Sequence, residues 1–235
     1  MSRAANLWAL GAAAAAFTVL AVLVELGDLK SVDQFAVRNL MPGGLPNDSR
    51  IPLIGHPLQY HGHHFDASQL VRLPANIVPA TLVFLFICWV LWRRRNIPVL
   101  IVWAFIFAVG NAVVLIGKET IKSPSLTRVV GGEVENVYDF LSSFPSGHST
   151  RIVLFTGILI YLWPWLRWLL PLWAAGALVS LEVDRIHTPS DIAGGILLGT
   201  TLLLAAPLIL PFVQQICARG SSRRIKSVPE PTRSD

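Results

Sequence analysis

The chain has 235 residues, of which 53% are hydrophobic and 14% are charged. A soluble domain carries about 25% charged residues, so this composition excludes an ordinary water-soluble protein and favours a membrane protein. The net charge of +5 does not point to nucleic acid as a partner, because the basic residues flank apolar segments, where anionic lipid headgroups are their natural counterparts.

Six apolar segments are candidates for membrane-spanning helices, which need about 20 mostly apolar residues. In chain order they are Leu7–Leu26, Pro74–Trp92, Ile97–Gly117, Ser149–Leu166, Trp168–Val183 and Ile192–Val213. The first follows Arg3 as a signal peptide would, but its apolar run is longer than such peptides use, so we expect it to be retained. The sequence therefore predicts an all-α, polytopic membrane protein with six transmembrane helices.

Lysine and arginine residues predict the orientation in the membrane. Arg3 precedes the first segment, residues 93–95 are arginines between the second and third, and Arg167 separates the fourth and fifth. With six spans these groups fall on one side, which the positive-inside rule assigns to the cytoplasm. Both termini are therefore expected on the cytoplasmic side, and the protein is expected in the plasma or inner membrane. The loops expected on the outer (periplasmic or extracellular) face are 28–73, 118–148 and 184–191.

The predicted membrane domain covers residues 1–216. Residues 217–235 are rich in serine, proline and charge, which predicts a disordered cytoplasmic tail. Neither Cys88 nor Cys217 lies in an outer loop, so no disulfide is expected. In the sixth segment, the four-residue spacing of two glycines indicates helix packing. The sequence carries no signal for an oligomeric state.

The first outer loop contains a histidine-rich tract, which raises the question of a metal site. The histidines are His56, His61, His63 and His64. They lie too close together in the chain to reach one ion jointly, and no cysteine or helical pair of histidines accompanies them. We therefore expect no metal there and interpret the loop as an interfacial segment that rests on the lipid headgroups.

The second outer loop begins and ends with groups that can bind an anion. Lys118 and Lys122 are four residues apart and would share one face of a continuing helix, although either is equally interpretable as a headgroup anchor. At the other end, Ser146 suits a helix N-cap, where free N–H groups attract anions. Gly147 leaves room for a ligand to approach the backbone. Arg151 follows His148 by three residues, so both side chains could project to one side of the helix.

A second histidine stands at the same membrane face, immediately before the sixth apolar segment. His187 is followed by Thr188, which can cap a helix, and by a proline that suits the first helical position. Asp191 follows His187 by four residues. A carboxylate beside an imidazole Nδ1–H fixes the tautomer and leaves Nε2 as a nucleophile or base. An acidic residue in a first helical turn is also ordinary dipole chemistry, but two histidine-bearing helix starts on one face predict a shared site.

These segments resemble the type 2 phosphatidic acid phosphatase (PAP2) family, the membrane relatives of the vanadium haloperoxidases. That family has three motif blocks: lysine, six residues, Arg-Pro; then Pro-Ser-Gly-His; then Ser-Arg, five residues, His, three residues, Asp. Residues 145–148 match the second block fully, and Ser180, His187 and Asp191 match the third. The resemblance covers roughly residues 97–200 and implies a PAP2-like helical core.

The resemblance also implies roles for individual residues. His187 would attack phosphorus and form a phosphohistidine, with Asp191 orienting its ring, and His148 would protonate the leaving oxygen and then activate water. The groups that would hold the phosphoryl oxygens are Lys118, Lys122, Ser146 and Gly147. No metal or other cofactor is implied.

Two arginines of the family pattern are absent. Ser125 and Leu181 stand at their positions. The cations available instead are Lys122, Arg128, Arg151 and Arg185. Arg151 is the preferred substitute, because it lies one helical turn from the first catalytic histidine, and Arg185, just before the second, follows it.

The expected function is that of an integral-membrane hydrolase acting at the outer leaflet on a lipid phosphate or diphosphate, with polyprenyl (undecaprenyl) diphosphate or a glycerophospholipid phosphate as substrate. Two alternatives stay open. Residues 122–127 resemble a subgroup that transfers phosphate from polyprenyl diphosphate to lipid A, which suggests a phosphotransferase. Loss of two arginines fits a catalytically silent lipid-binding member. A transporter is disfavoured, because the spans carry few ionisable residues.

Overall fold

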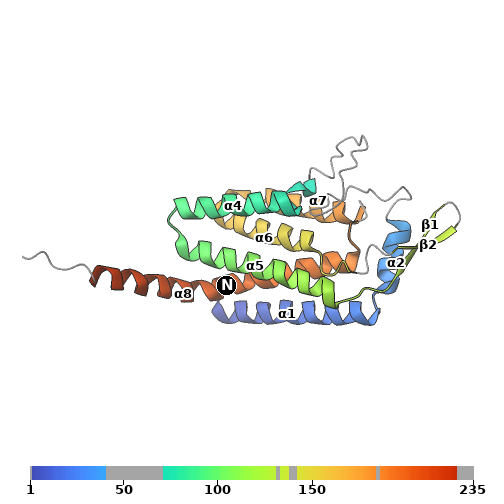
Figure 1. The fold of residues 1–235 in the computed structure, drawn as a ribbon, viewed down its shortest axis with the longest axis horizontal. Helices are drawn as coiled ribbons and strands as arrows, with labels where there is room; N and C mark the ends of the chain where they lie inside the picture. Colours follow the sequence, from blue (N-terminus) through green and yellow to red (C-terminus); the bar gives the residue numbers. More distant parts are fainter. Residues whose placement is uncertain (1, 41–70, 131–132, 138–141, 184–185, 227–235) are drawn as a thin grey trace, which may run out of the picture.

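The computed structural model describes residues 2–40, 71–130, 133–137, 142–183 and 186–226. This part of the chain folds into seven α-helices, two short 3-10 helices and one hairpin of two strands (Figure 1). The elements are α1 (Arg3–Leu26), α2 (Lys30–Asn39), η1 (Leu73–Ala75), α4 (Ile77–Arg93), α5 (Ile97–Thr120), β1 (Leu126–Val130), β2 (Glu133–Val137), α6 (Gly147–Leu162), η2 (Pro164–Arg167), α7 (Leu169–Val183) and α8 (Pro189–Lys226).

The predicted helical membrane fold is confirmed. Each of the six apolar segments corresponds to one of the helices α1 and α4 to α8. By length and composition, α1, α5 and α8 can cross a membrane. The other three helices are apolar but have 15 to 17 residues, roughly 22–26 Å at 1.5 Å per residue, which is less than the hydrocarbon core of about 30 Å. Six full spans are therefore compatible with the fold without being required by it.

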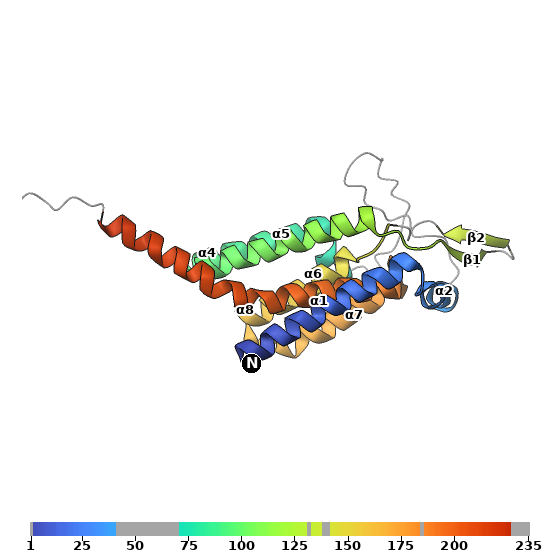
Figure 2. The same cartoon turned by 90° about the horizontal axis from the view of Figure 1, so that it is seen from below.

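Local sequence explains where the helices stop. The Ser2 side chain caps α1 by accepting a hydrogen bond from the Ala5 N–H, and Gly27 ends it with a φ of 78°, which glycine adopts without strain. The fourth predicted segment runs to residue 166, but α6 ends at Leu162 because Pro164 cannot continue the helix. Within α8, prolines at 207 and 211 remove backbone donors and account for the bend visible in Figure 2.

Helix α8 packs against α1, α5 and α6 along the bundle (Figure 2). Two of its glycines allow the close approach to α6: a Cβ on Gly195 would lie 2.4 Å from the Ser146 carbonyl oxygen, and one on Gly199 would lie 2.8 Å from Val153 Cβ. The spacing of these glycines thus serves helix packing, as the sequence indicates. It brings the starts of α6 and α8 together, and both histidine-bearing segments lie there.

The structure differs from the elements predicted from the sequence in three places. The outer segment after α1 contains an amphipathic helix, α2, and the loop after α5 contains the antiparallel hairpin of β1 and β2, which an all-α prediction does not include. Gln34 of α2 joins the two elements by accepting a hydrogen bond from the Thr127 N–H at 2.8 Å. Helix α8 continues to Lys226, nine residues beyond Cys217, where the sequence predicts the tail to begin.

Candidate active site

The two predicted histidines face each other between the starts of α6 and α8. His148 Nδ1 lies 3.3 Å from His187 Nε2, although the residues are 39 positions apart in the chain. The ring centroids are 5.4 Å apart and the ring planes meet at 60°. His187 is 4% exposed. The fold therefore brings together two imidazoles from separate helix starts, which is the arrangement that the motif blocks predict.

Asp191 lies on the far side of His187. Its Oδ2 is 3.6 Å from His187 Nδ1 and accepts hydrogen bonds from the Ser143 hydroxyl at 2.5 Å and from the Thr188 N–H at 3.1 Å. The Thr188 hydroxyl in turn accepts from the Asp191 N–H at 3.4 Å, which completes a capping box at the start of α8. Asp191 thus caps the start of α8 and also faces His187. Its two predicted roles, as an acidic residue in a first helical turn and as the partner of the histidine, are therefore compatible.

Burial lowers the pKa of His187, and the positive charges of Lys118 and Arg151 act in the same direction. The Asp191 carboxylate, 3.6 Å from His187 Nδ1, opposes this shift but does not cancel it. Because desolvation penalises the charged ring, a buried histidine of this kind stays neutral to lower pH than a free one. A neutral His187 with its Nδ1–H toward Asp191 presents the Nε2 lone pair to His148.

The Pro-Ser-Gly-His stretch forms the cap and first turn of α6. Ser146 is the N-cap, and its hydroxyl oxygen accepts a hydrogen bond from the Ser149 N–H at 3.2 Å. Its own N–H donates to the Asp191 carbonyl oxygen at 3.0 Å, which links the starts of the two helices. A Cβ on Gly147 would lie 3.4 Å from Arg151 Nη2, so the glycine keeps the space beside that guanidinium open.

Arg151 is a buried cation whose charge acts on both histidines. It is 8% exposed, its Nε donates to the Ala75 carbonyl oxygen at 2.8 Å, and its Nη1 donates to Asn111 Oδ1 at 3.1 Å. The two bonds fix the guanidinium from η1 and α5 while it sits one turn beyond His148 on α6. The preferred substitute for a missing family arginine therefore lies at the site.

The two lysines of the first block have different surroundings. Lys118, in the last turn of α5, is close enough to act electrostatically on Asp191 and Arg151. Lys122 lies beyond the end of α5 at Thr120, so the expected continuing helix is wrong. Its Nζ donates to the Lys118 carbonyl oxygen at 3.1 Å and to the Ser142 hydroxyl at 3.0 Å. Lys122 is exposed and stands at the edge of the site.

The remaining predicted positions lie elsewhere. Ser125 is exposed, and Leu181 is fully buried in a small apolar cluster with Ile152 and Ala177. Arg128 belongs to β1. Arg185 and the histidine-rich tract lie outside the described residues. Among the residues that are described, no group of three or more histidine, cysteine or acidic side chains is arranged to hold a metal ion.

Residues 72–76 around η1 form a third wall of the site, which the sequence does not indicate. Asn76 Oδ1 lies 3.0 Å from His148 Nε2, and the Ala75 carbonyl oxygen accepts from Arg151. Arg72 is 5% exposed, and its charge acts on His148. This segment precedes all three motif blocks and has no pattern of its own, so nothing in the sequence separates it from an ordinary loop end.

Helix α2 supports the start of α8 from outside. Asp33 is 4% exposed, and its carboxylate accepts from the Ser190 N–H at 3.1 Å and from the Ser190 hydroxyl at 2.7 Å. Burial raises the pKa of Asp33, as does the charge of Asp191, while the bonds from Ser190 lower it. No local pattern in the chain singles out this aspartate, because its partner Ser190 is 157 residues away.

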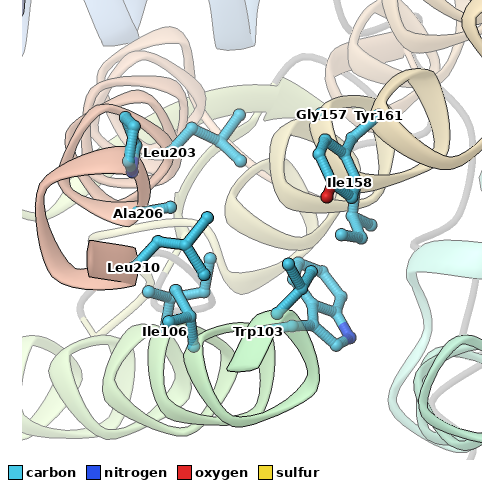
Figure 3. A pocket seen from close by; sticks show the side chains of 11 residues that line it. Trp103, Ile106, Gly157, Ile158, Tyr161, Leu203, Ala206 and Leu210 are labelled. Carbon is cyan, nitrogen blue, oxygen red and sulfur yellow. The ribbon is translucent and has the colours of Figure 1, made fainter. Parts of the chain in front are cut away.

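An apolar pocket of about 210 Å³ lies away from the histidines, between α5, α6 and α8 (Figure 3). The side chains labelled around it include Trp103, Ile158 and Leu210. Ile158 is ten residues beyond His148 on α6, which is roughly 15 Å along the helix. The pocket is therefore not part of the histidine site.

Comparison with known proteins agrees with the motif blocks. Residues 105–214 match the model of the PAP2 superfamily, and no curated protein sequence matches the chain. The fold is similar to the crystal structure of a transmembrane PAP2-type phosphatidylglycerolphosphate phosphatase from Bacillus subtilis, with a TM-score of 0.62 and 16% sequence identity. The match covers 89% of this chain and 98% of that one. The family that the motifs indicated is thus confirmed: residues 105–214 form a PAP2-superfamily domain within a polytopic membrane protein.

Proposed function

We propose that the chain is an integral-membrane phosphatase that hydrolyses a lipid phosphate or diphosphate through a phosphohistidine on His187. The observation that carries this proposal is the chain of groups Asp191, His187 and His148, with 3.6 Å between carboxylate and first ring and 3.3 Å between the rings. An oriented nucleophile next to a second proton-transfer group is the arrangement that covalent phosphoryl transfer needs.

In the first step, the lone pair of His187 Nε2 forms a bond to phosphorus while the bond from phosphorus to the leaving-group oxygen breaks. The electron pair of that bond stays on the oxygen, which takes a proton from His148 Nδ1. Asp191 holds the Nδ1–H of His187 and stabilises the positive charge that the ring gains. The lipid alcohol or lipid phosphate departs, and the phosphoryl group remains on His187.

In the second step, His148 Nδ1 takes a proton from water as the water oxygen attacks phosphorus. The bond between phosphorus and Nε2 breaks, its electron pair returns to His187, and inorganic phosphate leaves. His148 is then protonated and His187 neutral, as at the start. One histidine therefore acts as acid and then as base, which microscopic reversibility allows.

The phosphoryl oxygens require positive charge and N–H donors, and the described residues supply both. The N-terminal turn of α6 offers the Gly147 amide beside the Ser146 hydroxyl, and a helix start favours anions. Arg151 and Lys118 add cations whose charges reach both histidines. Charge that develops on the oxygens during transfer is stabilised by such preorganised groups. These cations make the catalytically active form the favoured alternative over a silent one.

The substrate class is a lipid with a terminal phosphate at the membrane surface. The site lies where α6 and α8 begin, whereas arginines 93–95 and Arg167 lie at the opposite ends of α4 and α6. Positive-inside bias then supports an outer-face site with cytoplasmic termini. We propose polyprenyl diphosphate or a glycerophospholipid phosphate, and the similar Bacillus subtilis protein, named as a phosphatidylglycerolphosphate phosphatase, supports the second class.

The test is a substrate panel in detergent micelles with the full-length protein. Polyprenyl diphosphate, phosphatidylglycerol phosphate and phosphatidate are each assayed for inorganic phosphate and for newly phosphorylated lipid. We expect release of phosphate from at least one lipid, its loss in His187→Ala, and its retention in the surface variant Asn39→Ala. Phosphate that appears on a second lipid instead of in water would replace hydrolysis with transfer. Release by His187→Ala at the wild-type rate would rule out the proposed nucleophile.

A further inference from the structure

Asn76 is the N-cap of α4, but its side chain does not cap that helix. An asparagine at this position ordinarily accepts a hydrogen bond from an N–H of the first turn. Asn76 makes no such bond, and its Oδ1 lies 3.0 Å from His148 Nε2 instead. The side chain therefore serves the site and not its own helix.

The proton content of the histidine pair follows from what its outer nitrogens face. His148 Nε2 faces Asn76 Oδ1, and His187 Nδ1 faces the Asp191 carboxylate. Such oxygens only accept hydrogen bonds, so the 3.0 Å contact to Asn76 requires a hydrogen on His148 Nε2, and a hydrogen on His187 Nδ1 would point to the Asp191 carboxylate, 3.6 Å away. The inner nitrogens, 3.3 Å apart, form a hydrogen bond only if one of them carries a hydrogen as well. In the form that reacts, the pair therefore holds three protons on four nitrogens, and one ring is an imidazolium.

The third proton belongs on His148. In the proposed function, His187 Nε2 needs a lone pair to attack phosphorus, and His148 Nδ1 must hold the proton that the leaving oxygen takes. The charged groups around His148 work against this arrangement: Lys118 from α5, Arg151 from α6 and Arg72 next to η1 all act on it, and its other neighbour is a histidine. Asp191, the acidic group at the start of α8, stands behind His187.

We propose that Asn76 is the positioning residue for the general acid. Its carbonyl oxygen accepts the Nε2–H of His148, orients the ring and favours the form in which the Nδ1 proton is aimed at the leaving-group oxygen. This inference rests on the proposed function and deepens it. It extends the site to a residue outside the PAP2-superfamily domain at 105–214, at the start of the second predicted span.

The test separates acid catalysis from general damage by changing the leaving group. The two substrates are a long-chain alkyl phosphate, whose alcohol leaves only with a proton, and a nitrophenyl phosphate with the same alkyl chain, whose phenolate leaves without one. Acid catalysis contributes roughly 10²–10⁴-fold where it is needed. We expect Asn76→Ala to lower kcat/KM for the alkyl phosphate about tenfold or more and for the nitrophenyl phosphate less than about threefold.

Three further variants make the result specific. Asn76→Asp keeps an acceptor oxygen toward His148 and should recover most of the activity on the alkyl phosphate. Asn96→Ala is the matched control, because Asn96 at the start of α5 is also an N-cap without a side-chain cap bond. This variant should leave kcat/KM unchanged for both substrates. Asn76→Leu keeps the branched shape and the number of side-chain heavy atoms, removes the acceptor oxygen, and replaces the alanine variant if that variant does not fold.

Each outcome decides the question. The ratio of the two substrates within one preparation does not depend on the folded fraction. An equal loss on both substrates, or an aspartate variant no better than alanine, would overturn the role of Asn76 while leaving the proposed function intact. If the wild-type protein releases no phosphate from either substrate, the proposed function itself fails. A loss confined to the alkyl phosphate and rescued by aspartate supports the proposal.

Discussion

The carbonyl oxygen of Ser146 occupies the place where a side chain at position 195 would begin. A Cβ on Gly195 would lie 2.4 Å from that oxygen and 2.6 Å from Ser149 Cβ, both in the first turn of α6. The same turn carries His148, so this contact fixes how closely the two histidine-bearing helix starts approach each other. A small residue in α8 is therefore a condition for the site.

Gly195→Ala should lower the free energy of unfolding by about 1–3 kcal/mol, because added volume in a tight contact forces backbone shifts. The loss is measurable as a lower melting temperature in detergent. It should also reduce phosphate release more than the stability loss explains, since the shift separates His148 from His187. Gly11→Ala is the control: a Cβ there meets no atom within 4 Å, and alanine is the better helix former. Equal behaviour of the two variants would contradict the packing argument.

Arg151→Ala should lower kcat/KM by about 10²-fold, the usual cost of removing one charge-stabilising donor from a site. Arg151→Lys should recover only part of this loss, because an ammonium cannot bond the Ala75 carbonyl oxygen and Asn111 in the same fork geometry. Arg167→Ala, an exposed arginine at the other end of the bundle, serves as the control. The measurement is steady-state kcat/KM on the lipid phosphate that the wild type hydrolyses fastest. An unchanged kcat/KM in Arg151→Ala would show that Arg151 does not bind the phosphate.

Asp33→Ala should weaken the start of α8, because it leaves the Ser190 N–H without its acceptor in a buried place. A lost bond of this kind costs about 1–3 kcal/mol, measurable as a lower melting temperature in detergent. Asp28→Ala changes an exposed aspartate just before α2 and should have little effect. If Asp33→Ala melts with the wild type, α2 does not hold the start of α8.

The pH dependence follows from His187. Burial lowers its pKa from the ordinary 6.5 despite the opposing carboxylate of Asp191, and the nucleophile must be neutral. The acid limb of kcat/KM should therefore lie below pH 6.5. Between the lowered pKa and 6.5 the unfolded chain binds more protons at this residue, so its contribution to stability rises with pH.

Asp191→Asn removes the opposing charge and should move the residual acid limb to still lower pH. The measurement is a pH profile of kcat/KM for both proteins on the same lipid. An acid limb above pH 6.5 in the wild type, or a shift to higher pH in Asp191→Asn, would show that a different group controls the reaction.

The membrane class, the resemblance to the PAP2 family and the residues of the motif blocks could all be predicted from the sequence. Apolar runs of sufficient length predict membrane helices because backbone polar groups must pair internally in lipid. His148, His187 and Asp191 were identified because each stands at a helix start, and helix starts carry local signals: a cap, a proline and a fixed spacing to the acidic group.

The other groups at the site became apparent only in the folded structure. Asn76 and Arg72 lie before the motif blocks, and Asp33 lies on a helix that the sequence leaves inside a loop. Asn76 contacts His148, 72 residues later in the chain, and Asp33 contacts Ser190, 157 residues later. Contacts at such separations depend on how closely α8 packs on α6 and on where η1 and α2 come to rest. A hydrogen bond across that distance leaves no periodicity or spacing in the chain, whereas a helix cap does, because its donor and acceptor are three residues apart.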